Sequence, residues 1–452
     1  MLKPYDGYKE TTIPWLEEVP SHWESKKINE LFKERKSKVS DKDFAPLSVT
    51  KKGIVPQLSN AAKSNDSDNR KLVCEGDFVI NSRSDRKGSS GISPLTGSVS
   101  LINIVLEPRK QNNSKFMHHL LKSNSFIEEY YRNGRGIVAD LWTTRYSEMK
   151  TITLPVPPRE EQDQIVKYLD WQISKISTLI KAKKKQIELL KEQKQAVINR
   201  AVTKGLDDTV PMKDGGVAWL GEVPEHWVVK PLKYFASSND ESLSNLESDD
   251  FELNYIDIST VGFTYLKMLP VRYKFKDAPS RARRIVRRGD TIISTVRTYL
   301  KSMCYIDEEL DNHIASTGFS VLRPNSSVFP KLLAYSLSCD YFVNQISRNS
   351  IGVSYPAISD SKLLGIKIAL PETQNEQIKI YELVQEKTTL IDKAIAVIEK
   401  EIELVSEYKT SLISSVVTGK VDVRDVVVPD FEVVEDEISE DEGLEVDMDD
   451  SN

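Results

Sequence analysis

The chain has 452 residues, more than one ordinary hydrophobic core accommodates, and 39% of them are hydrophobic and 29% charged, so we expect two or more globular domains. The formal net charge of −6 is unevenly distributed, because residues 430–452 carry twelve acidic and no basic side chains, which leaves residues 1–429 with a net charge of +6. Three scattered cysteines are too few for a disulfide framework or a closed zinc site, and the mildly basic body permits a polyanionic partner without requiring one.

The beginning of the chain, MLKPYDGYKE, lacks the basic and then apolar pattern of a secretory signal. No apolar run approaches the roughly 20 residues that a membrane-spanning helix needs. We therefore expect a cytoplasmic protein that has no membrane partner.

The first recognisable feature along the chain is a phrase that occurs twice. WLEEVPSHW (residues 15–23) and WLGEVPEHW (219–227) share both tryptophans, the Val-Pro pair and the histidine. Two tryptophans that flank a proline turn can bury a large apolar area, so we expect each phrase to dock against the end of a helix. The equivalent histidines, His22 and His226, are expected to pack or cap in this docked segment.

The strands expected next are also duplicated. CEGDFVINSR (74–83) is similar to RRGDTIISTVR (287–297), and LTGSVSLI (95–102) is similar to STGFSVLR (316–323). Each Gly-Asp pair predicts a tight turn that opens an apolar, β-branched strand. Because internal similarity indicates a repeated architecture, we expect two related domains.

Each copy ends in a strand that leads into a long helix. ITLPVPPREEQDQI (152–165) and IKIALPETQNEQI (366–378) combine alternating apolar residues, a proline and a Gln-rich polar turn. Apolar residues then recur with a period of 3.5 over more than four heptads, which is typical of a coiled coil. The expected interface residues are Leu169, Ile173, Ile176, Ile180, Ile187, Leu190 and Val197 in the first helix, and Val384, Ile391, Ile395, Ile398, Ile402, Val405 and Leu412 in the second.

Two lysines interrupt this helix pattern and two glycines end it. Lys183 and Lys194 interrupt the first seam, and they predict either polar contacts that fix the register or side chains that extend to the edge of the interface. Gly205 and Gly419 are suited to end the helices. Two such seams can bury each other, so we expect an antiparallel pair with a globular domain at each end and a seam of roughly 48 Å.

The resulting fold class is α+β. We expect two globular α/β domains separated by two long helices, which form an antiparallel coiled coil in a pseudo-two-fold internal repeat. The expected boundaries are 1–157 for the first domain, 158–206 for the first helix, 207–370 for the second domain, 371–421 for the second helix, and 422–452 for an acidic tail that we expect to be disordered.

These features resemble the specificity subunit of type I restriction-modification systems. The resemblance extends to about Asp425 and depends on WLGEVPEHW, the two Pro-Gln leads into the helices and the duplicated alternation of domain and helix. It implies that each globular domain is a target-recognition domain for one half of a bipartite, asymmetric site in double-stranded DNA. The helix pair would set the spacer between the halves.

The resemblance also implies the partners of the chain. Two modification subunits, which are adenine-N6 methyltransferases, would bind the helices, and restriction subunits with motor and nuclease activity would join them for cleavage. The chain itself would be non-catalytic and would hold no metal and no cofactor, since S-adenosylmethionine, ATP and Mg²⁺ would belong to the partners. Consistent with this, the sequence contains neither an Asn-Pro-Pro-aromatic motif for a flipped base nor a P-loop.

Basic stretches in both domains are candidates for DNA contacts. The planar fork of arginine suits a phosphate or the O6 and N7 atoms of guanine. The candidates are Arg83, Arg86, Lys87, Arg132, Arg135 and Arg145 in the first domain, and Arg281, Arg283, Arg284, Arg287, Arg288, Arg297, Lys301, Arg348 and Tyr355 in the second. Half-sites about one helical turn apart, roughly 34–36 Å, could be bridged by the expected helix pair.

A coiled-coil scaffold without sequence-specific DNA binding is the alternative interpretation. This alternative accounts for the helices but not for the two domains. The domains have similar flanking sequences but different central sequences, residues 41–60 and 247–270. Recognition of two unlike half-sites predicts that difference. The charge of the tail raises the further hypothesis that the tail competes with DNA for the basic surfaces.

Overall fold

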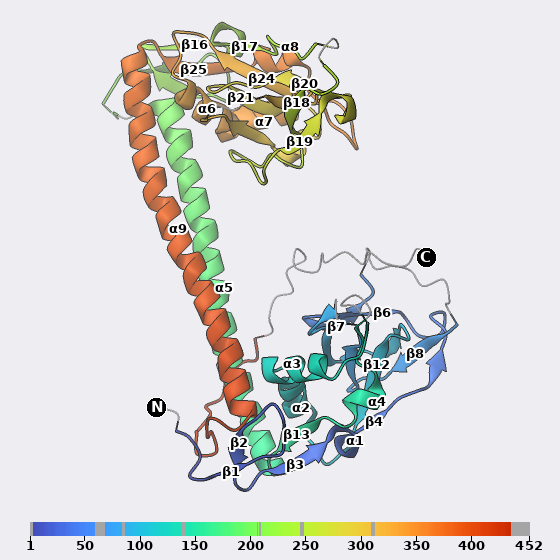
Figure 1. Cartoon of the computed structure of the whole chain (residues 1–452). Helices are drawn as coiled ribbons and strands as arrows, with labels where there is room; N and C mark the ends of the chain where they lie inside the picture. Colours follow the sequence, from blue (N-terminus) through green and yellow to red (C-terminus); the bar gives the residue numbers. More distant parts are fainter. Residues whose placement is uncertain are drawn as a thin grey trace. The chain divides into compact units, whose positions relative to one another are not determined.

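The computed structural model describes residues 3–58, 68–83, 86–137, 142–205, 207, 209–244, 248–308 and 312–434. The chain forms two compact units, each of which contains one globular domain and parts of the two long helices, α5 (Arg159–Lys204) and α9 (Gln374–Val417) (Figure 1). Unit 1 comprises Met1–Lys184 and Glu399–Asn452, and unit 2 comprises Lys185–Ile398. Each compact unit therefore includes about half of each long helix. The expected boundaries instead treat each helix as a segment separate from the globular domains.

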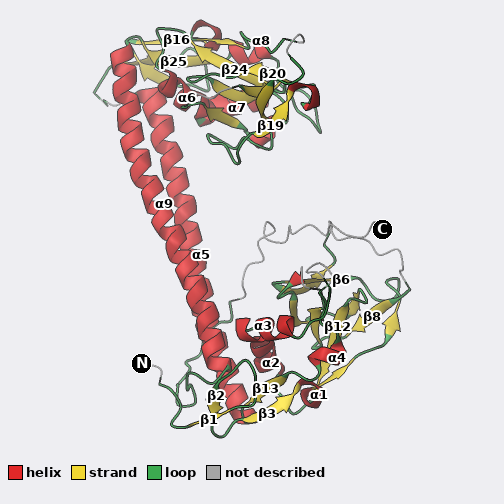
Figure 2. Ribbon diagram, in the orientation of Figure 1, coloured by secondary structure: helices red, strands yellow, loops and turns green. Residues whose placement is uncertain are grey.

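The frame of unit 1 is an antiparallel four-stranded sheet with the strand order β10-β9-β12-β4. Its strands are β4 (Phe32–Glu34), β9 (Phe78–Asn81), β10 (Ser90–Ile92) and β12 (Asn103–Pro108). Helices α2 (Ser114–Leu121) and α3 (Asn124–Arg132) lie between this sheet and α5 (Figure 2). Their buried faces join the sheet and the beginning of α5 into one hydrophobic core.

The remaining elements of unit 1 are short. Three strands, β5 (Lys38–Val39), β8 (Arg70–Val73) and β11 (Gly97–Val99), form a second sheet, in the order β11-β8-β5. The paired strands are β1 (Tyr8–Glu10) with β2 (Glu18–Pro20), β3 (Glu24–Lys27) with β13 (Thr153–Val156), and β6 (Leu47–Thr50) with β7 (Gly53–Pro56), and the short helices are α1 (Ile28–Leu31) and α4 (Tyr146–Met149).

Unit 2 repeats the same frame. Its first sheet has the order β22-β21-β24-β17, which matches β10-β9-β12-β4 strand for strand. The strands are β17 (Ala236–Ser238), β21 (Thr291–Ser294), β22 (Met303–Tyr305) and β24 (Phe319–Pro324). Helices α6 (Pro330–Ser338) and α7 (Asp340–Asn349) follow β24 as α2 and α3 follow β12. The described residues therefore contain a structural repeat, as the duplicated phrases predict.

The second sheet distinguishes unit 2 from unit 1. It has four strands in the order β19-β18-β23-β20, namely β18 (Glu252–Ile256), β19 (Val271–Lys274), β20 (Ala282–Ile285) and β23 (His313–Ser316), and β18 pairs with β23 in parallel. The other elements are β14 (Met212–Asp214) paired with β15 (Glu222–Pro224), β16 (Trp227–Pro231) paired with β25 (Lys367–Pro371), α8 (Asp360–Gly365) and the 3-10 helices η3 (Leu232–Tyr234), η4 (Phe275–Asp277) and η5 (Thr298–Leu300).

Strand pairing confirms one expected match between the repeats and corrects another. The two Gly-Asp turns open β9 and β21, which occupy equivalent places in the two sheets. The match of LTGSVSLI with STGFSVLR is wrong, because residues 97–99 form β11 in the second sheet of unit 1, whereas residues 319–324 form β24 in the frame. The counterpart of β24 is β12, since hydrogen-bond register, rather than a run of small residues, defines equivalent strands.

The two long helices pair in antiparallel fashion within each unit. In unit 1, Leu169 near the beginning of α5 shares a core with Leu412 and Val416 near the end of α9. In unit 2, Val202 at the end of α5 shares a core with Val384 near the beginning of α9. Of the expected seam residues, Leu169, Ile176, Ile187, Val384, Ile391, Ile395, Ile398 and Leu412 are buried, and Ile173, Ile180, Leu190, Val197, Ile402 and Val405 are half-buried.

The polar interruptions of the seam form ion pairs between the helices. Lys183 pairs with Glu401 of α9, and the Lys194 Nζ atom lies 2.7 Å from the Asp392 carboxylate. Both lysine side chains extend to the edge of the seam and contact an acidic partner there. Within the described ranges, no helix combines the length and hydropathy that crossing a membrane requires.

The helices end where the glycines predict. Gly205 follows α5 directly with a φ of 72°, and Gly419 lies just after α9 with a φ of 79°, so both adopt the left-handed conformation that closes a helix. Gly419 also lies against Trp23, since a Cβ atom there would be 3.3 Å from Trp23 Cη2.

The beginning of the expected acidic tail is ordered, which corrects the prediction for residues 422–434. Val423 and Val428 are buried in the core of unit 1, and the Gln164 side chain of α5 donates hydrogen bonds to the backbone carbonyls of Val423 and Val426 at 3.0 and 2.8 Å. Valines that precede the acidic stretch account for this packing, because they bury apolar surface against the core. Residues 435–452 lie outside the described residues.

Candidate nucleic-acid interface

The first repeated phrase docks against the beginning of α5 through one carboxylate. Trp23 is fully buried, and its Nε1 atom donates a hydrogen bond to Glu161 in the first turn of α5 at 2.9 Å. His22 Nε2 lies 2.7 Å from the same carboxylate, and the Tyr5 hydroxyl donates to it at 2.7 Å. Burial, reinforced by Glu161, raises the pKa of Tyr5. Trp15 is half-buried, and its Nε1 atom donates to the Thr153 carbonyl at 3.2 Å.

The second phrase docks against the beginning of α9 in the same way. Trp227 is buried and donates from Nε1 to Glu376 at 3.0 Å, and His226 Nε2 lies 2.9 Å from Glu376. Docking against a helix end is confirmed for both phrases. The large apolar burial expected of both tryptophans is not achieved by Trp219, which is 41% exposed. The acidic partners were not predicted, although both stand in the Gln-rich leads that the sequence shares.

The residue after each carboxylate connects the helix to the globular domain. Gln162 accepts a hydrogen bond from the Asn113 backbone N–H at 2.8 Å, which joins α5 to the beginning of α2. Gln377 accepts one from the Phe329 backbone N–H at 2.7 Å, which joins α9 to the beginning of α6. Each Glu-Gln pair thus fixes both the repeated phrase and the helices of the frame to the same helix end.

Two loops of unit 1 are joined by backbone pairing beside the frame sheet. One follows β9 and the other follows α3. Thr143 forms isolated antiparallel bridges with both Arg83 and Arg135, and the Thr144 N–H donates to the Ser82 carbonyl at 2.9 Å. We call these segments the unit 1 loop pair, which comprises residues 82–83, 86–89, 133–137 and 142–145.

Unit 2 contains an equivalent unit 2 loop pair, residues 295–302 after β21 and 350–359 after α7. Ala357 forms isolated antiparallel bridges with both Val296 and Ile351, and the Ile358 N–H donates to the Thr295 carbonyl at 2.9 Å. These bonds occupy the same places as those in unit 1. The backbone frame of the loops is therefore duplicated, although their side chains differ.

All six basic candidates of the first domain lie in or directly beside the unit 1 loop pair. Lys87 pairs with Glu128 at 2.7 Å and lies 4.6 Å from the centroid of the Tyr131 ring. Arg132 pairs with Glu129 at 2.6 Å, and Arg135 lies 3.8 Å from Glu148. Arg83 and Arg86 occupy the first loop, and Arg145 is exposed in the second. Basic residues far apart in the sequence thus lie in or beside one pair of loops.

The unit 2 loop pair contains Arg297, Lys301 and Tyr355, and Arg348 lies beside it in the last turn of α7. The Arg297 guanidinium carbon lies 4.9 Å from the centroid of the Tyr355 ring. Several large apolar or aromatic side chains of this loop pair are exposed, and they are Tyr299, Leu300, Ile351, Val353 and Tyr355. Among the described residues, this loop pair contains fewer basic side chains than the unit 1 loop pair.

The other basic candidates of the second domain lie outside the loop pair. Arg281, Arg283, Arg284, Arg287 and Arg288 occupy β20 and the turns that flank it. Arg283 lies 5.3 Å from the centroid of the Phe275 ring, and Arg287 donates to Glu241 at 2.9 and 2.6 Å. The structure therefore divides the basic candidates of this domain between two places.

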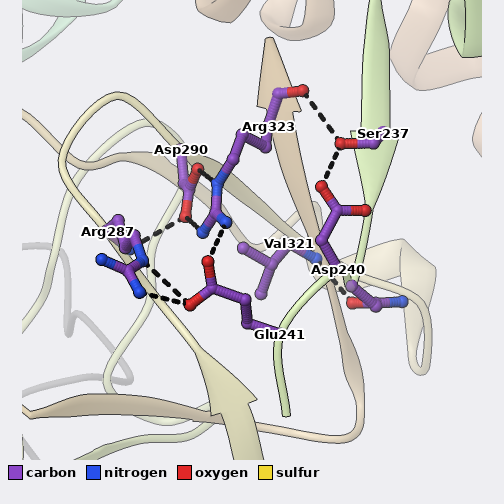
Figure 3. Close-up of polar contacts among 8 residues, drawn as sticks. Ser237, Asp240, Glu241, Arg287, Asp290, Val321 and Arg323 are labelled. Atoms are coloured by element: carbon purple, nitrogen blue, oxygen red, sulfur yellow. Dashed lines mark hydrogen bonds and ion pairs between the residues drawn. The ribbon is translucent and has the colours of Figure 1, made fainter. Parts of the chain in front are cut away.

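Figure 3 shows the polar network that contains Arg287. Asp290, buried after the Gly-Asp turn, accepts hydrogen bonds from Arg323 Nε at 2.9 Å and Nη2 at 2.8 Å, and Glu241 accepts from Arg323 Nη1 at 2.8 Å. The hydrogen bonds that Arg323 donates to Asp290 and Glu241 raise the pKa of Arg323. This network joins β24 to the beginning of β21.

Unit 1 contains the same arrangement with an arginine from another strand. Asp77 accepts hydrogen bonds from Arg35 Nε at 2.7 Å and Nη2 at 3.1 Å, which raise the pKa of Arg35. Arg35 follows β4, whereas Arg323 belongs to β24. The Gly-Asp pairs predicted the turns but not these arginines, because the two partners are distant in the sequence.

The chain is similar to proteins of one kind. The family described as type I restriction modification DNA specificity domain matches residues 20–189 and 224–404. The type I restriction enzyme MjaVIII specificity subunit of Methanocaldococcus jannaschii is 25% identical over 427 residues, covering 90% of this chain and 95% of that one. The type I restriction enzyme EcoKI specificity subunit of Escherichia coli K12 is 30% identical over 169 residues, covering 37% of this chain and 32% of that one.

A solved structure supports the fold. A chain from a structure of the assembly and conformational transition of the type I R-M system superposes with a TM-score of 0.61 at 16% identity. The match covers 89% of this chain and 99% of that one. At this level of identity the similarity shows the fold of two α/β domains with two long helices.

Proposed function

The chain belongs to the type I restriction modification DNA specificity family, and from this premise we propose that it is the DNA sequence-recognition subunit of a type I restriction-modification complex. Each globular domain binds one half of a bipartite, asymmetric site in double-stranded DNA. The two long helices set the number of base pairs between the halves.

The observation that carries this proposal is the duplicated loop pair. Equivalent backbone hydrogen bonds give both loop pairs a defined shape, while their exposed side chains differ. Phosphate contacts position a protein on DNA, and contacts to base edges specify the sequence. A constant frame that presents different side chains supports recognition of two unlike half-sites.

The helix pair is the proposed docking surface for two modification subunits, the adenine-N6 methyltransferases. Its support is a set of large apolar side chains that the helices leave exposed, namely Leu179, Leu189, Leu390, Val397, Leu404 and Tyr408. Leu189 and Leu404 stand at equivalent positions of the two helices. Exposed apolar groups of this kind favour a partner protein. Restriction subunits, which supply the motor and nuclease, join this assembly.

We propose further that the chain does no chemistry itself. The curated relatives are named specificity subunits, which supports a recognition role. In this proposal S-adenosylmethionine, ATP and Mg²⁺ are bound by the modification and restriction subunits.

The experiment that tests the proposal is to co-express the chain with the modification subunit encoded beside it and to sequence the methylated DNA of the host. We expect one split motif that carries N6-methyladenine in each half and disappears when the gene for this chain is deleted. If no methylation depends on the chain and no methyltransferase co-purifies with it, the recognition role fails, and a coiled-coil scaffold becomes the better account.

A further inference from the structure

Arg297 carries a charge that no carboxylate among the described residues neutralises. In the described part of unit 2, Arg287 and Arg323 form ion pairs with Glu241, and Arg323 also pairs with Asp290. Among the described residues, no carboxylate forms an ion pair with Arg297, and its guanidinium instead lies 4.9 Å from the centroid of the Tyr355 ring. A guanidinium over an aromatic face keeps the donors at its edge available to another acceptor.

The backbone at Arg297 is held in an unfavourable conformation. Its φ and ψ are 50° and 49°, and Lys301 at the other end of η5 is also left-handed, with a φ of 52° and a ψ of 27°. This conformation is unfavourable for a non-glycine residue, because the Cβ atom comes too close to the following carbonyl oxygen, so surrounding contacts must maintain it. The contacts include a 2.9 Å hydrogen bond from the Leu300 N–H to the Arg297 carbonyl and a 2.8 Å bond between the hydroxyls of Thr298 and Ser350.

The surroundings of Arg297 suit a base edge better than a phosphate. Val353, Ile351 and Tyr355 are 102%, 70% and 65% exposed, and all three belong to the same loop pair. Apolar side chains contribute nothing to binding a phosphate, whereas contact with base edges and sugars buries them. The exposed Lys301 and Arg348 remain for the phosphates that flank such a site.

We propose that Arg297 reads a guanine in the half-site bound by unit 2, by donating two hydrogen bonds from its guanidinium to the O6 and N7 atoms. Tyr355 is a positioning residue, because its ring sets the plane of the guanidinium before DNA binds. The fixed backbone and the aromatic face reduce the freedom that Arg297 loses on binding. This inference rests on the proposed function and assigns a specific contact within it.

The experiment uses the complete complex with the modification subunits. The probes are DNA duplexes that carry the motif found by methylome sequencing, with each guanine replaced in turn by 7-deazaguanine, which lacks the N7 acceptor. For the unaltered complex we expect one replacement to weaken binding by roughly 5-fold or more. Arg297→Met removes both donors, so it weakens binding to the unmodified duplex by roughly 5- to 150-fold and is insensitive to 7-deazaguanine at that one position.

Tyr355 has its own diagnostic pair of variants. Tyr355→Phe retains the ring and is expected to keep the 7-deazaguanine profile of the unaltered complex. Tyr355→Ala loses the ring and is expected to weaken the effect at the same guanine alone. The matched control is Arg272→Met, because Arg272 is exposed on β19 and pairs with Glu252 away from the loop pair, and it should leave the whole profile unchanged.

Three results would overturn the inference. The first is an Arg297→Met complex whose affinity falls by the same factor for the motif and for an unrelated duplex, since uniform weakening is the behaviour of a phosphate contact. The second is a motif with no guanine in either half, and the third is a Tyr355→Phe profile that equals that of Tyr355→Ala. The unrelated duplex also tests the proposed function separately. If the unaltered complex binds it as tightly as the motif, the proposed function itself fails.

Discussion

Single carboxylates at the beginnings of α5 and α9 determine how each domain is attached to its helix. Glu161 has a side chain that is only 6% exposed and accepts hydrogen bonds from Tyr5 and Trp23, with His22 as a third neighbour. A buried carboxylate that loses a donor keeps its desolvation penalty, which makes each donor important for stability. Glu376 is 33% exposed, so water can replace a donor more readily there.

We therefore expect Trp23→Phe to destabilise the protein more than Trp227→Phe. Both changes retain an aromatic ring and remove the N–H that donates to the carboxylate. The loss at Trp23 should be about 1–3 kcal/mol. Thermal or denaturant unfolding of the two variants measures the difference, and equal losses would contradict the importance of burial at Glu161.

Two neighbouring histidines in α2 predict a pH dependence for unit 1. Burial lowers the pKa of His118 to about 3 and that of His119 to about 4, so both are neutral in the folded protein. The unfolded chain protonates them below about pH 6.5, so their effect on stability is absent above that pH and grows as the pH falls. In addition, His118 Nδ1 accepts the Ile92 N–H at 3.2 Å and must stay unprotonated to do so.

The expected loss is on the order of 1–2 kcal/mol per histidine at pH 5. His118→Asn offers a matched variant, because an amide oxygen can accept the Ile92 N–H and does not titrate. Unfolding measured between pH 7.5 and 5 should show a shallower decline for this variant than for the unaltered protein. Parallel declines would show that His118 does not contribute to the pH dependence.

At the scale of the elements, the helix pair combines an apolar seam with ion pairs at its edge. The apolar seam is shared by the two helices, and Lys183 and Lys194 pair with Glu401 and Asp392 of the partner helix. Partly exposed ion pairs contribute little to stability, typically about 0.2–1 kcal/mol. Each ion pair nevertheless joins one particular residue of α5 to one particular residue of α9. A shift of one helix along the other would break both pairs, which favours a role in fixing the register of the helices.

A charge exchange between Lys194 and Asp392 tests this role. Lys194→Asp or Asp392→Lys alone places like charges opposite each other and should destabilise the protein by up to about 1 kcal/mol. The double variant restores an ion pair and should recover most of that loss. A coupling energy near zero at low salt, measured by unfolding in a double-mutant cycle, would show that the contact has no energetic role.

At the scale of the whole chain, each unit is completed by segments that are distant in the sequence. Gly419, just after α9, lies against Trp23 in unit 1, and Gly205, just after α5, lies against Trp227 in unit 2. The end of each helix thus occupies the same place beside a repeated tryptophan. In unit 1 the chain continues through residues 420–434, which pack on α5 and the core.

Residues 422–434 are packed in the fold of unit 1, and this determines how the acidic tail should be tested. Deletion of residues 435–452 removes most of the negative charge and leaves the packed segment in place. If the tail competes with DNA, the deletion should tighten DNA binding at low salt, and the difference should shrink as salt screens the charges. Unchanged affinity would end that hypothesis. Deletion from residue 422 is unsuitable, because it also removes Val423 and Val428 from the core.

Several features of the fold could be predicted from sequence because their physical cause is local or periodic. The seam from Leu169 to Leu412 follows from a 3.5-residue period, and the helix ends follow from Gly205 and Gly419. The duplicated frame follows from repeated phrases such as WLEEVPSHW. The basic stretches of the unit 1 loop pair were visible as well, since charge is a property of composition.

Other features depended on contacts that no local pattern encodes. The pairing of Arg83 and Arg135 with Thr143, and of Val296 and Ile351 with Ala357, joins loops that follow different elements. The partners of Asp77 and Asp290 come from different strands in the two units, and β12 rather than β11 is the counterpart of β24. Sequence by itself therefore determined the repeat and the helices, because these depend on residue type and spacing. Only the tertiary structure decided which arginines are committed to carboxylates and which face solvent, because that depends on the register of strands and loops brought together by folding.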